Sequence, residues 1–143
     1  MEKKFKLDQI HKIASGIISK IRKSKIKTAV VVALSGELGA GKTNLTQEIA
    51  KQFGVNENVV SPTFVIMKKY KINGNRFKNL IHIDAYRIEH SKELEHLNWK
   101  EFLNDPTNLI LIEWPEKVSE IIPEHTIMVY LSHVDDETRE VKF

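Results

Sequence analysis

Eight consecutive residues, from Gly36 to Thr43, carry the clearest chemical signal in the sequence. They read Gly-Glu-Leu-Gly-Ala-Gly-Lys-Thr, which fits the P-loop pattern of a glycine, four variable residues and then Gly-Lys-Thr. Glycines let backbone N–H groups turn inward around a phosphate chain, because no Cβ stands in the way. In such a loop Lys42 would reach the β- and γ-phosphates, and the Thr43 hydroxyl would hold Mg²⁺. The pattern therefore predicts a site for a nucleoside triphosphate with magnesium.

The residues on either side of this loop have the context that a P-loop needs. Residues 28–34 are apolar and rich in β-branched side chains, which is typical of a buried parallel strand. After the loop, Leu45, Ile49 and Phe53 recur at helical spacing, and Gly54 is a natural helix end. A strand, a glycine loop and a helix are therefore expected in that order.

Two carboxylates follow apolar runs and are candidates for the chemistry. Glu113 comes directly after residues 109–112, which is the Walker B pattern, and Asp84 ends residues 80–83 in the same way. Ligands of open α/β sheets bind at the carboxyl ends of the strands, so both side chains are expected near Mg²⁺. One would hold the metal and the other would orient the attacking water, but the spacing does not decide between them. Asp84 has the alternative role of a turn cap.

Residues 61–64, Ser-Pro-Thr-Phe, form the most suggestive loop after the P-loop. Pro62 stiffens it, and Thr63 has a hydroxyl that could reach the γ-phosphate or Mg²⁺, as in the switch loops of GTPases. The simpler alternative is a turn that leads into a strand.

Three further side chains lie close to these motifs in the sequence. His82 would share a strand face with Asp84, where it either orients that carboxylate or packs. Arg87 would either contact the migrating phosphoryl group or pair with Asp84 or Glu89. Trp114 would stack on an adenine ring, lie against a partner, or pack in the core.

Length and composition bound the remaining possibilities. The 143 residues are enough for one core covered on two faces, so we expect a single domain over residues 1–143. The net charge of +3 permits an acidic or RNA partner without arguing for one, and the lysines from Lys20 to Lys27 are expected to be a solvated surface. There is no cysteine, no apolar run long enough for a membrane span and no leader-like segment. We therefore expect a cytoplasmic protein with no membrane or DNA partner.

The other periodicities indicate the elements that would position these residues. An isoleucine-rich stripe predicts a helix over residues 10–21. Residues 63–72 and 77–84 are expected to be strands joined by a tight turn at Asn73-Gly74. Short helices are expected over residues 91–103 and 118–122, and a final hairpin over residues 127–143. The prediction is an α/β fold, a P-loop NTPase-like three-layer sandwich with a mixed, partly antiparallel central sheet.

Taken together, the motifs resemble the TsaE family, also called YjeE. The sequence has Gly36–Thr43, then Ser-Pro-Thr-Phe at 61–64, His-Ile-Asp-Ala-Tyr-Arg at 82–87, and Glu113-Trp114. This order and this combination are highly specific, and the resemblance covers nearly the whole chain. TsaE is the P-loop ATPase of bacterial tRNA threonylcarbamoyladenosine biosynthesis.

The resemblance implies a function beyond nucleotide binding. Members act with TsaD and TsaB, which place a threonylcarbamoyl group on adenosine 37 of tRNAs that read ANN codons. They bind ATP with Mg²⁺, hydrolyse it slowly alone, and are thought to reset the TsaD–TsaB complex between turnovers. tRNA would be reached indirectly, through that complex.

The residue roles follow from the motifs and from this resemblance together. Lys42, Asp84 and Glu113 are the expected catalytic residues, and Thr43, Glu113 and Asp84 are the expected metal ligands. The expected nucleotide contacts are Glu37, Leu38, Gly39, Ala40, Gly41, Lys42, Thr43, Asn44, Thr63, Arg87 and Trp114. Two positions depart from the family: Asn44 replaces a frequent threonine, and Asn98 replaces a glycine, which puts the turn at that position in doubt.

Two other classes of function compete with this prediction. A self-sufficient small-molecule kinase would share the P-loop, but arginines are scarce and no lid segment is evident. A GTP-dependent switch would need a guanine-recognition motif, and no Asn-Lys-x-Asp stretch is present.

Overall fold

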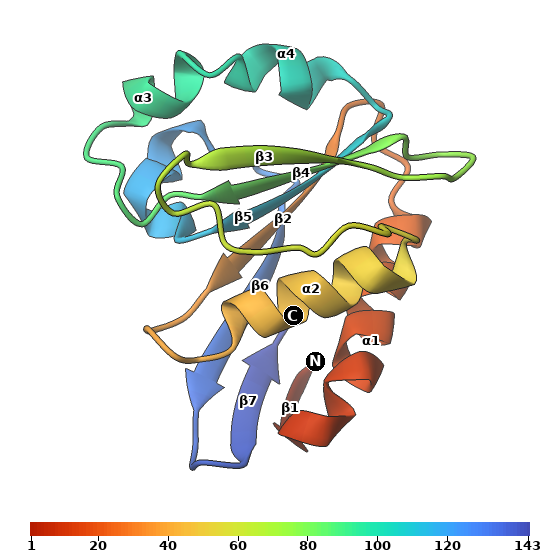
Figure 1. The fold of residues 1–143 in the computed structure, drawn as a ribbon, viewed down its shortest axis with the longest axis vertical. Coiled ribbons are helices and arrows are strands. Elements are labelled where there is room, and N and C mark those ends of the chain that lie inside the picture. The colour runs from red at the N-terminus through yellow and green to blue at the C-terminus, as the bar shows by residue number, and fades with distance from the viewer.

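A single seven-stranded sheet runs through the computed structural model, which describes residues 1–143 (Figure 1). The order of the strands across the sheet is β1-β7-β6-β2-β5-β4-β3. The strands are β1 (Glu2–Lys6), β2 (Val30–Ser35), β3 (Met67–Lys71), β4 (Asn79–Asp84), β5 (Asn108–Glu113), β6 (Ile127–His133) and β7 (Thr138–Lys142). The helices are α1 (Ile10–Lys23), α2 (Lys42–Gln52), α3 (Ser91–Glu95) and α4 (Trp99–Asn104), with 3₁₀ helices η1 (Leu7–Gln9) and η2 (Pro115–Ile121).

The middle of the sheet is parallel and its margins are antiparallel. Strands β6, β2, β5 and β4 run in the same direction. On one margin β3 pairs antiparallel with β4, and on the other β7 and β1 add antiparallel strands beside β6. This arrangement confirms the predicted α/β fold with a mixed sheet.

Helices cover both faces of the sheet and form the outer layers. On β2, Val30 and Val32 pack in the larger apolar cluster, which contains the buried residues of α1 and α2. Val31 and Ala33 face the opposite way, into a second cluster with residues of α3, α4 and η2. Because both faces of the sheet are covered there, β2 and β5 are almost continuously apolar, as residues 28–34 suggested for β2. Figure 1 shows α1 and α2 on one side of the sheet and α3 and α4 on the other.

Two predicted details of the strands are wrong, and one strand was not predicted. Residues 63–66 form a turn, and β3 begins only at Met67. The tight turn at Asn73-Gly74 is replaced by a longer connection, closed by a hydrogen bond from Ile72 N–H to the Lys78 carbonyl (2.8 Å). The edge strand β1 was not expected, because Phe5 is its only buried residue. The secondary structure of each of these segments depends on its contacts with distant parts of the chain more than on its local sequence pattern.

The remaining elements agree with the periodicities. The region 91–103 forms two short helices, and the chain ends in the β6–β7 hairpin. Asn98 lies in the left-handed region (φ 66°) between α3 and α4, which asparagine tolerates better than most residues. The turn there is therefore kept without the glycine. None of the helices has the length and apolar character needed to cross a membrane.

Candidate functional site

Three neighbouring strands end level with one another and bring the sequence motifs together. In the register of the sheet, Glu113 on β5 lies beside Leu34 on β2 and beside Asp84 on β4. Strand β2 ends at Ser35, one residue after Leu34, and the P-loop begins at Gly36. The two candidate carboxylates therefore lie at the carboxyl edge of the sheet, next to the loop, as the strand-end argument predicted.

Glycine is needed at two positions of the P-loop for different reasons. A Cβ on Gly36 would lie 2.5 Å from the carbonyl oxygen of Leu131, which is too close for any side chain. Gly41 has a φ of 103° and begins α2 without a side-chain cap. The first backbone N–H groups of α2 therefore have no partner within the helix, which is the arrangement that favours an anion.

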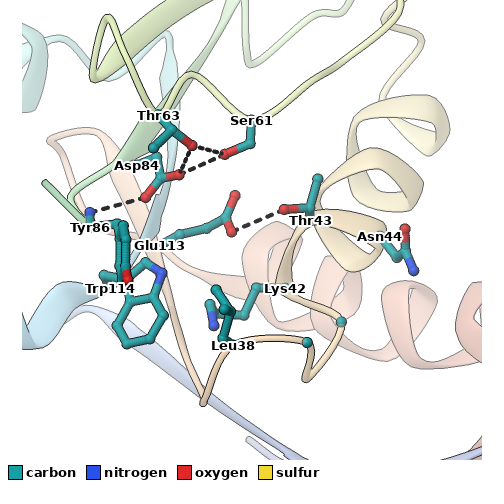
Figure 2. A pocket seen from close by; sticks show the side chains of 12 residues that line it. Leu38, Lys42, Thr43, Asn44, Ser61, Thr63, Asp84, Tyr86, Glu113 and Trp114 are labelled. Atoms are coloured by element: carbon teal, nitrogen blue, oxygen red, sulfur yellow. Dashed lines mark hydrogen bonds between the residues drawn. The ribbon is translucent and has the colours of Figure 1, made fainter. Parts of the chain in front are cut away.

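A pocket of about 380 Å³ lies between the P-loop, the two strand ends and the loop 61–66 (Figure 2). Ten of the predicted site residues line it. Ser61 and Tyr86, which were not predicted as site residues, complete the lining. The full set is Leu38, Gly39, Gly41, Lys42, Thr43, Asn44, Ser61, Thr63, Asp84, Tyr86, Glu113 and Trp114.

Lys42 is held by the P-loop itself. Its Nζ donates to the carbonyl of Gly36 and to that of Glu37 (2.9 Å), and its side chain is almost fully buried. Burial lowers the pKa of Lys42 below its usual range, against the opposing attraction of nearby carboxylates. These are Glu113, Glu116, Asp84 and Glu37. A polyphosphate in the pocket would add negative charge beside this ammonium and favour its protonated form.

Glu113 is fixed from two sides in the interior of the protein. One carboxylate oxygen, Oε1, lies 3.2 Å from the Thr43 hydroxyl, and the other, Oε2, lies 2.6 Å from Nε2 of His82. His82 is fully buried, and its Nδ1 has no hydrogen-bond partner. Because a carboxylate oxygen accepts, Nε2 of His82 is the donor in its hydrogen bond with Glu113. Of the two roles that the sequence left open for His82, orienting Asp84 is wrong because its partner is Glu113, and the residue is instead packed and hydrogen-bonded in the interior.

Asp84 forms hydrogen bonds with the loop 61–66 and none with the P-loop. Its Oδ2 accepts hydrogen bonds from Ser61 Oγ (2.6 Å) and Thr63 Oγ1 (2.8 Å), and its Oδ1 accepts from the backbone N–H of Tyr86 (3.0 Å). Figure 2 shows these hydroxyls pointing at the carboxylate from above the pocket. Asp84 thus ties the loop 61–66 to the end of β4.

The same loop has a strained backbone. Ile66 has a φ of 70°, which is a real outlier for a β-branched residue. Its N–H donates to the Pro62 carbonyl (2.6 Å), and its own carbonyl accepts from the N–H of Asp84 (2.8 Å). Strain of this kind costs about 1–3 kcal/mol and persists only where surrounding contacts enforce it. Asp84 supplies those contacts through both its backbone and its side chain.

Two aromatic rings close one side of the pocket. Trp114 is half-buried, and its ring centroid lies 5.0 Å from that of Tyr86. The Nζ of Lys42 lies 4.1 Å from the centroid of the Trp114 ring, within the range of a cation–π contact. Trp114 therefore packs against the second apolar cluster and also forms part of the pocket wall, beside the lysine that would bind phosphate.

Three of the predicted nucleotide contacts have side chains that do not line the pocket. Ala40 is buried in the core, and the Glu37 carboxylate is exposed, 3.5 Å from the backbone N–H of His133. Arg87 is exposed, and its guanidinium lies 4.2 Å from the centre of the Phe64 ring. Neither of its alternative partners, Asp84 or Glu89, is within ion-pairing distance. Arg87 follows the end of β4 by three residues and turns outward there.

The comparisons with known proteins bear on the same residues. The family model described as "Threonylcarbamoyl adenosine biosynthesis protein TsaE" matches residues 6–141. The chain belongs to the TsaE family.

Individual relatives agree with that assignment. The chain is 40% identical over 108 residues to the tRNA threonylcarbamoyladenosine biosynthesis protein TsaE of Haemophilus influenzae, covering 76% of this chain and 66% of that protein. It is 33% identical over 126 residues to the protein of the same name from Bacillus subtilis, covering 88% and 76% respectively. The crystal structure of Bacillus subtilis YdiB superimposes with a TM-score of 0.69 at 26% identity, covering 99% of this chain and 83% of that one.

The side chains at this TsaE-family site suit a magnesium ion that is coordinated mainly by the phosphates of a bound nucleotide. No group of three or more His, Asp or Glu side chains is close enough to hold a metal by itself. Mg²⁺ typically takes one or two carboxylates and completes its coordination with phosphates and water. The Thr43 hydroxyl and Glu113 Oε1 stand side by side, and Asp84 ends the next strand. The residues present therefore fit Mg²⁺ bound together with a nucleotide, and fit no free-standing metal site.

Proposed function

We propose that this chain is the ATP-binding and slowly hydrolysing component of the tRNA N6-threonylcarbamoyladenosine machinery, and that it acts with TsaD and TsaB. The proposal rests above all on the pocket that joins Lys42 and Thr43 of the P-loop to Glu113 and Asp84. Its cofactors would be ATP and Mg²⁺. The names of the relatives supply the pathway.

The charges of the pocket support a metal–nucleotide complex over a free nucleotide. Two nearly buried carboxylates face Lys42, the only cation in the lining. Such a pocket would repel a bare triphosphate, and a divalent cation between the carboxylates and the phosphates removes that repulsion. When bound, Mg²⁺ would neutralise charge on the phosphates, and Thr43 and Glu113 would hold it.

Each residue has a distinct part in the proposed binding step. Lys42 would exchange the carbonyls of Gly36 and Glu37 for phosphate oxygens, which form stronger, charge-assisted bonds. The free N–H groups at the start of α2 would contact the same phosphates. Thr63 would sense the γ-phosphate by leaving Asp84, which would release the strained loop 61–66.

The absence of an arginine from the pocket lining supports dependence on a partner. Phosphoryl transfer is usually accelerated by a guanidinium on the migrating group, worth about 10³–10⁵ in rate where it is supplied. Arg87 lies on Phe64 outside the pocket, so the isolated chain is left with Lys42 alone. Slow hydrolysis alone is the expected consequence.

Exposed apolar side chains around the pocket support a protein partner at its mouth. Leu38 and Tyr86 line the pocket and are 76% and 45% exposed, and Phe64 beside Thr63 is 82% exposed. Large apolar side chains gathered around a site usually mark a surface that another protein covers. We assign this rim to the TsaD–TsaB complex.

The test is an ATPase assay with the purified full chain, with and without TsaD and TsaB. We expect slow Mg²⁺-dependent hydrolysis alone and a faster rate when both partners are added. Strong phosphorylation of a metabolite by the chain alone would support the kinase alternative and overturn the proposal. A clear preference for GTP over ATP would overturn it as well.

A further inference from the structure

The edge of the sheet opposite the pocket carries a concentration of positive charge that the proposed function does not use. The segment 9–36 contains six Lys and Arg residues and no Asp or Glu, so the other 115 residues carry a net charge of −3. Most of these cations lie at the end of α1 and in the loop that leads to the first residue of β2. The positive charge is therefore local, although the chain as a whole has a net charge of only +3.

The fold adds cations from two distant segments to the same edge. The carboxyl end of α2 and the connection between β3 and β4 lie there as well, at the right of Figure 1, whereas the P-loop lies at the left. We call this surface the basic edge. It consists of Arg22, Lys23, Lys25, Lys27, Lys51, Arg76 and Lys78, all of them at least partly exposed. The acidic residues on the neighbouring segments are Glu48, Glu57 and Asp105.

Two arginines at the centre of the basic edge are held in place by aromatic rings. The guanidinium of Arg22 lies 5.0 Å from the centre of the Phe53 ring, and that of Arg76 lies 4.9 Å from the centre of the Phe77 ring. The two rings pack edge to face with their centres 5.7 Å apart. This stacking places both guanidiniums without the help of a carboxylate.

Both arginines face the same hollow of about 300 Å³ and keep free donors. Arg76 Nη1 donates to the carbonyls of Ile21 and Arg22 (both 3.2 Å), which caps the end of α1. The Arg22 guanidinium makes no hydrogen bond within the protein, and neither arginine pairs with a carboxylate within 4 Å. Guanidinium groups that are fixed in position and not paired with a carboxylate are suited to bind phosphate groups.

From these observations we infer that the basic edge binds the phosphate backbone of a structured RNA directly. Seven cations spread over the ends of two helices and two connections suit a row of phosphates better than a single small anion. The relatives are named for tRNA modification, so tRNA is the RNA to test. This contact goes beyond the proposed function, in which tRNA is reached only through TsaD and TsaB.

The experiment is a titration of a fluorescently labelled, unmodified tRNA transcript with the full chain at several salt concentrations. The basic-edge variant is Lys23→Gln/Lys25→Gln/Lys27→Gln. The matched control, Lys92→Gln/Lys100→Gln/Lys117→Gln, removes the same charge from exposed positions on α3, α4 and η2. ATP binding by each variant shows that the chain is folded and separates this test from that of the proposed function.

We expect the basic-edge variant to bind tRNA about tenfold more weakly, with a shallower dependence on salt, because each lost phosphate contact reduces the slope by about one. Arg22→Gln alone should weaken binding severalfold, and the control should bind like the parent chain. Equal losses in the control and the basic-edge variant would overturn the inference, as would no binding by the parent chain at low salt. Unchanged tRNA binding with lost capture of TsaD–TsaB would assign the surface to an acidic protein instead.

Discussion

Asp84 and Glu113 end neighbouring parallel strands at the same level of the sheet, and yet their surroundings differ. Glu113 is fixed by Thr43 and by His82, which belong to the P-loop helix and to an interior strand. Asp84 is bonded to Ser61 and Thr63 of a loop whose backbone is strained at Ile66. Sequence spacing could not distinguish these two residues. In the structure Glu113 lies in a rigid region, whereas Asp84 holds a strained loop that can be released.

This difference suggests how the two carboxylates divide the work. A side chain held from two sides can keep a metal and its phosphates in one geometry, as electrostatic catalysis requires. A side chain that holds a strained loop can instead couple the bound state of the pocket to the position of that loop. We assign the first role to Glu113 and the second to Asp84, and the following experiments test that division.

The largest effect is expected from Glu113→Gln. The variant keeps the size and hydrogen-bonding capacity of the side chain but removes its charge, so ATP hydrolysis should fall by about 10²-fold or more. The measurement is single-turnover hydrolysis with saturating Mg²⁺-ATP. Glu116→Gln removes a neighbouring charge outside the pocket lining and should change the rate by less than about threefold. Similar rates in both variants would contradict the role of Glu113.

Lys42→Ala should weaken ATP binding by about 10- to 100-fold, because a hydrogen bond to a charged group is worth about 1.5–3 kcal/mol. Calorimetric titration of the variant with Mg²⁺-ATP measures this loss. Lys51→Ala, at the other end of α2, is the control and should leave the affinity unchanged. Unchanged affinity in Lys42→Ala would refute its contact with phosphate.

A pair of substitutions at His82 tests how Glu113 is positioned. His82→Leu removes the buried donor to Oε2 and should lower the hydrolysis rate about tenfold, since an unpaired buried group costs about 1–3 kcal/mol. His82→Gln retains a donor at a similar reach and should restore most of the rate. ATP affinity should change by less than about twofold in both, because His82 does not line the pocket. Equal rates in the two variants, at equal folded fraction, would reduce His82 to a packing residue.

Asp84→Asn tests the releasable region. The amide has only one acceptor oxygen, so it cannot accept both the two hydroxyls at the former Oδ2 and the Tyr86 N–H at the former Oδ1; the loop 61–66 should therefore open more often. Loss of about 1.4 kcal/mol from the loop contacts would speed hydrogen exchange there about tenfold. Mass-spectrometric exchange on residues 61–67 measures this change. Normal exchange combined with loss of Mg²⁺-dependent ATP binding would show that Asp84 holds the metal.

The smallest effect is expected at Ile66. Relieving a left-handed β-branched residue recovers about 1–2 kcal/mol, but glycine costs about 0.5–1 kcal/mol in chain entropy. Ile66→Gly should therefore be more stable than Ile66→Ala by up to about 1 kcal/mol in urea unfolding, because both variants lose the packing of this half-buried side chain and only glycine relieves the strain. At Val65, an exposed neighbour without a positive φ, the glycine variant should be the less stable of the same pair. An Ile66→Gly variant less stable than Ile66→Ala would argue against stored strain.

Much of the fold and of the site follows from local sequence pattern. The P-loop needs glycine at Gly41 because its φ of 103° suits a residue without a Cβ, whatever its surroundings. The parallel strands could be predicted because burial on both faces requires apolar residues throughout. Strand ends then place Glu113 and Asp84 at one edge, which needs no knowledge of long-range contacts.

What could not be predicted depends on contacts between segments that are distant in the sequence. His82 contacts Glu113 across the β4–β5 pair, whereas the sequence offered only packing or a contact with its near neighbour Asp84. Arg87 turns outward onto Phe64, and no local pattern sets the direction of a side chain after a strand end. Residues 63–66 are expected to begin a strand, but hydrogen bonds to Asp84 hold them in a turn. The basic edge is visible in the sequence only as the cluster from Lys20 to Lys27, and the fold extends it by bringing Arg76 beside Arg22.

The most direct test of the division between the two carboxylates is the effect of Mg²⁺ on ATP binding. Calorimetric titrations of the parent chain, Glu113→Gln and Asp84→Asn would be made with and without the metal. If Glu113 and Thr43 hold Mg²⁺, the metal should tighten ATP binding to the parent chain and to Asp84→Asn, but not to Glu113→Gln. If Mg²⁺ instead strengthens binding to Glu113→Gln as much as to the parent chain, the role assigned to Glu113 is wrong.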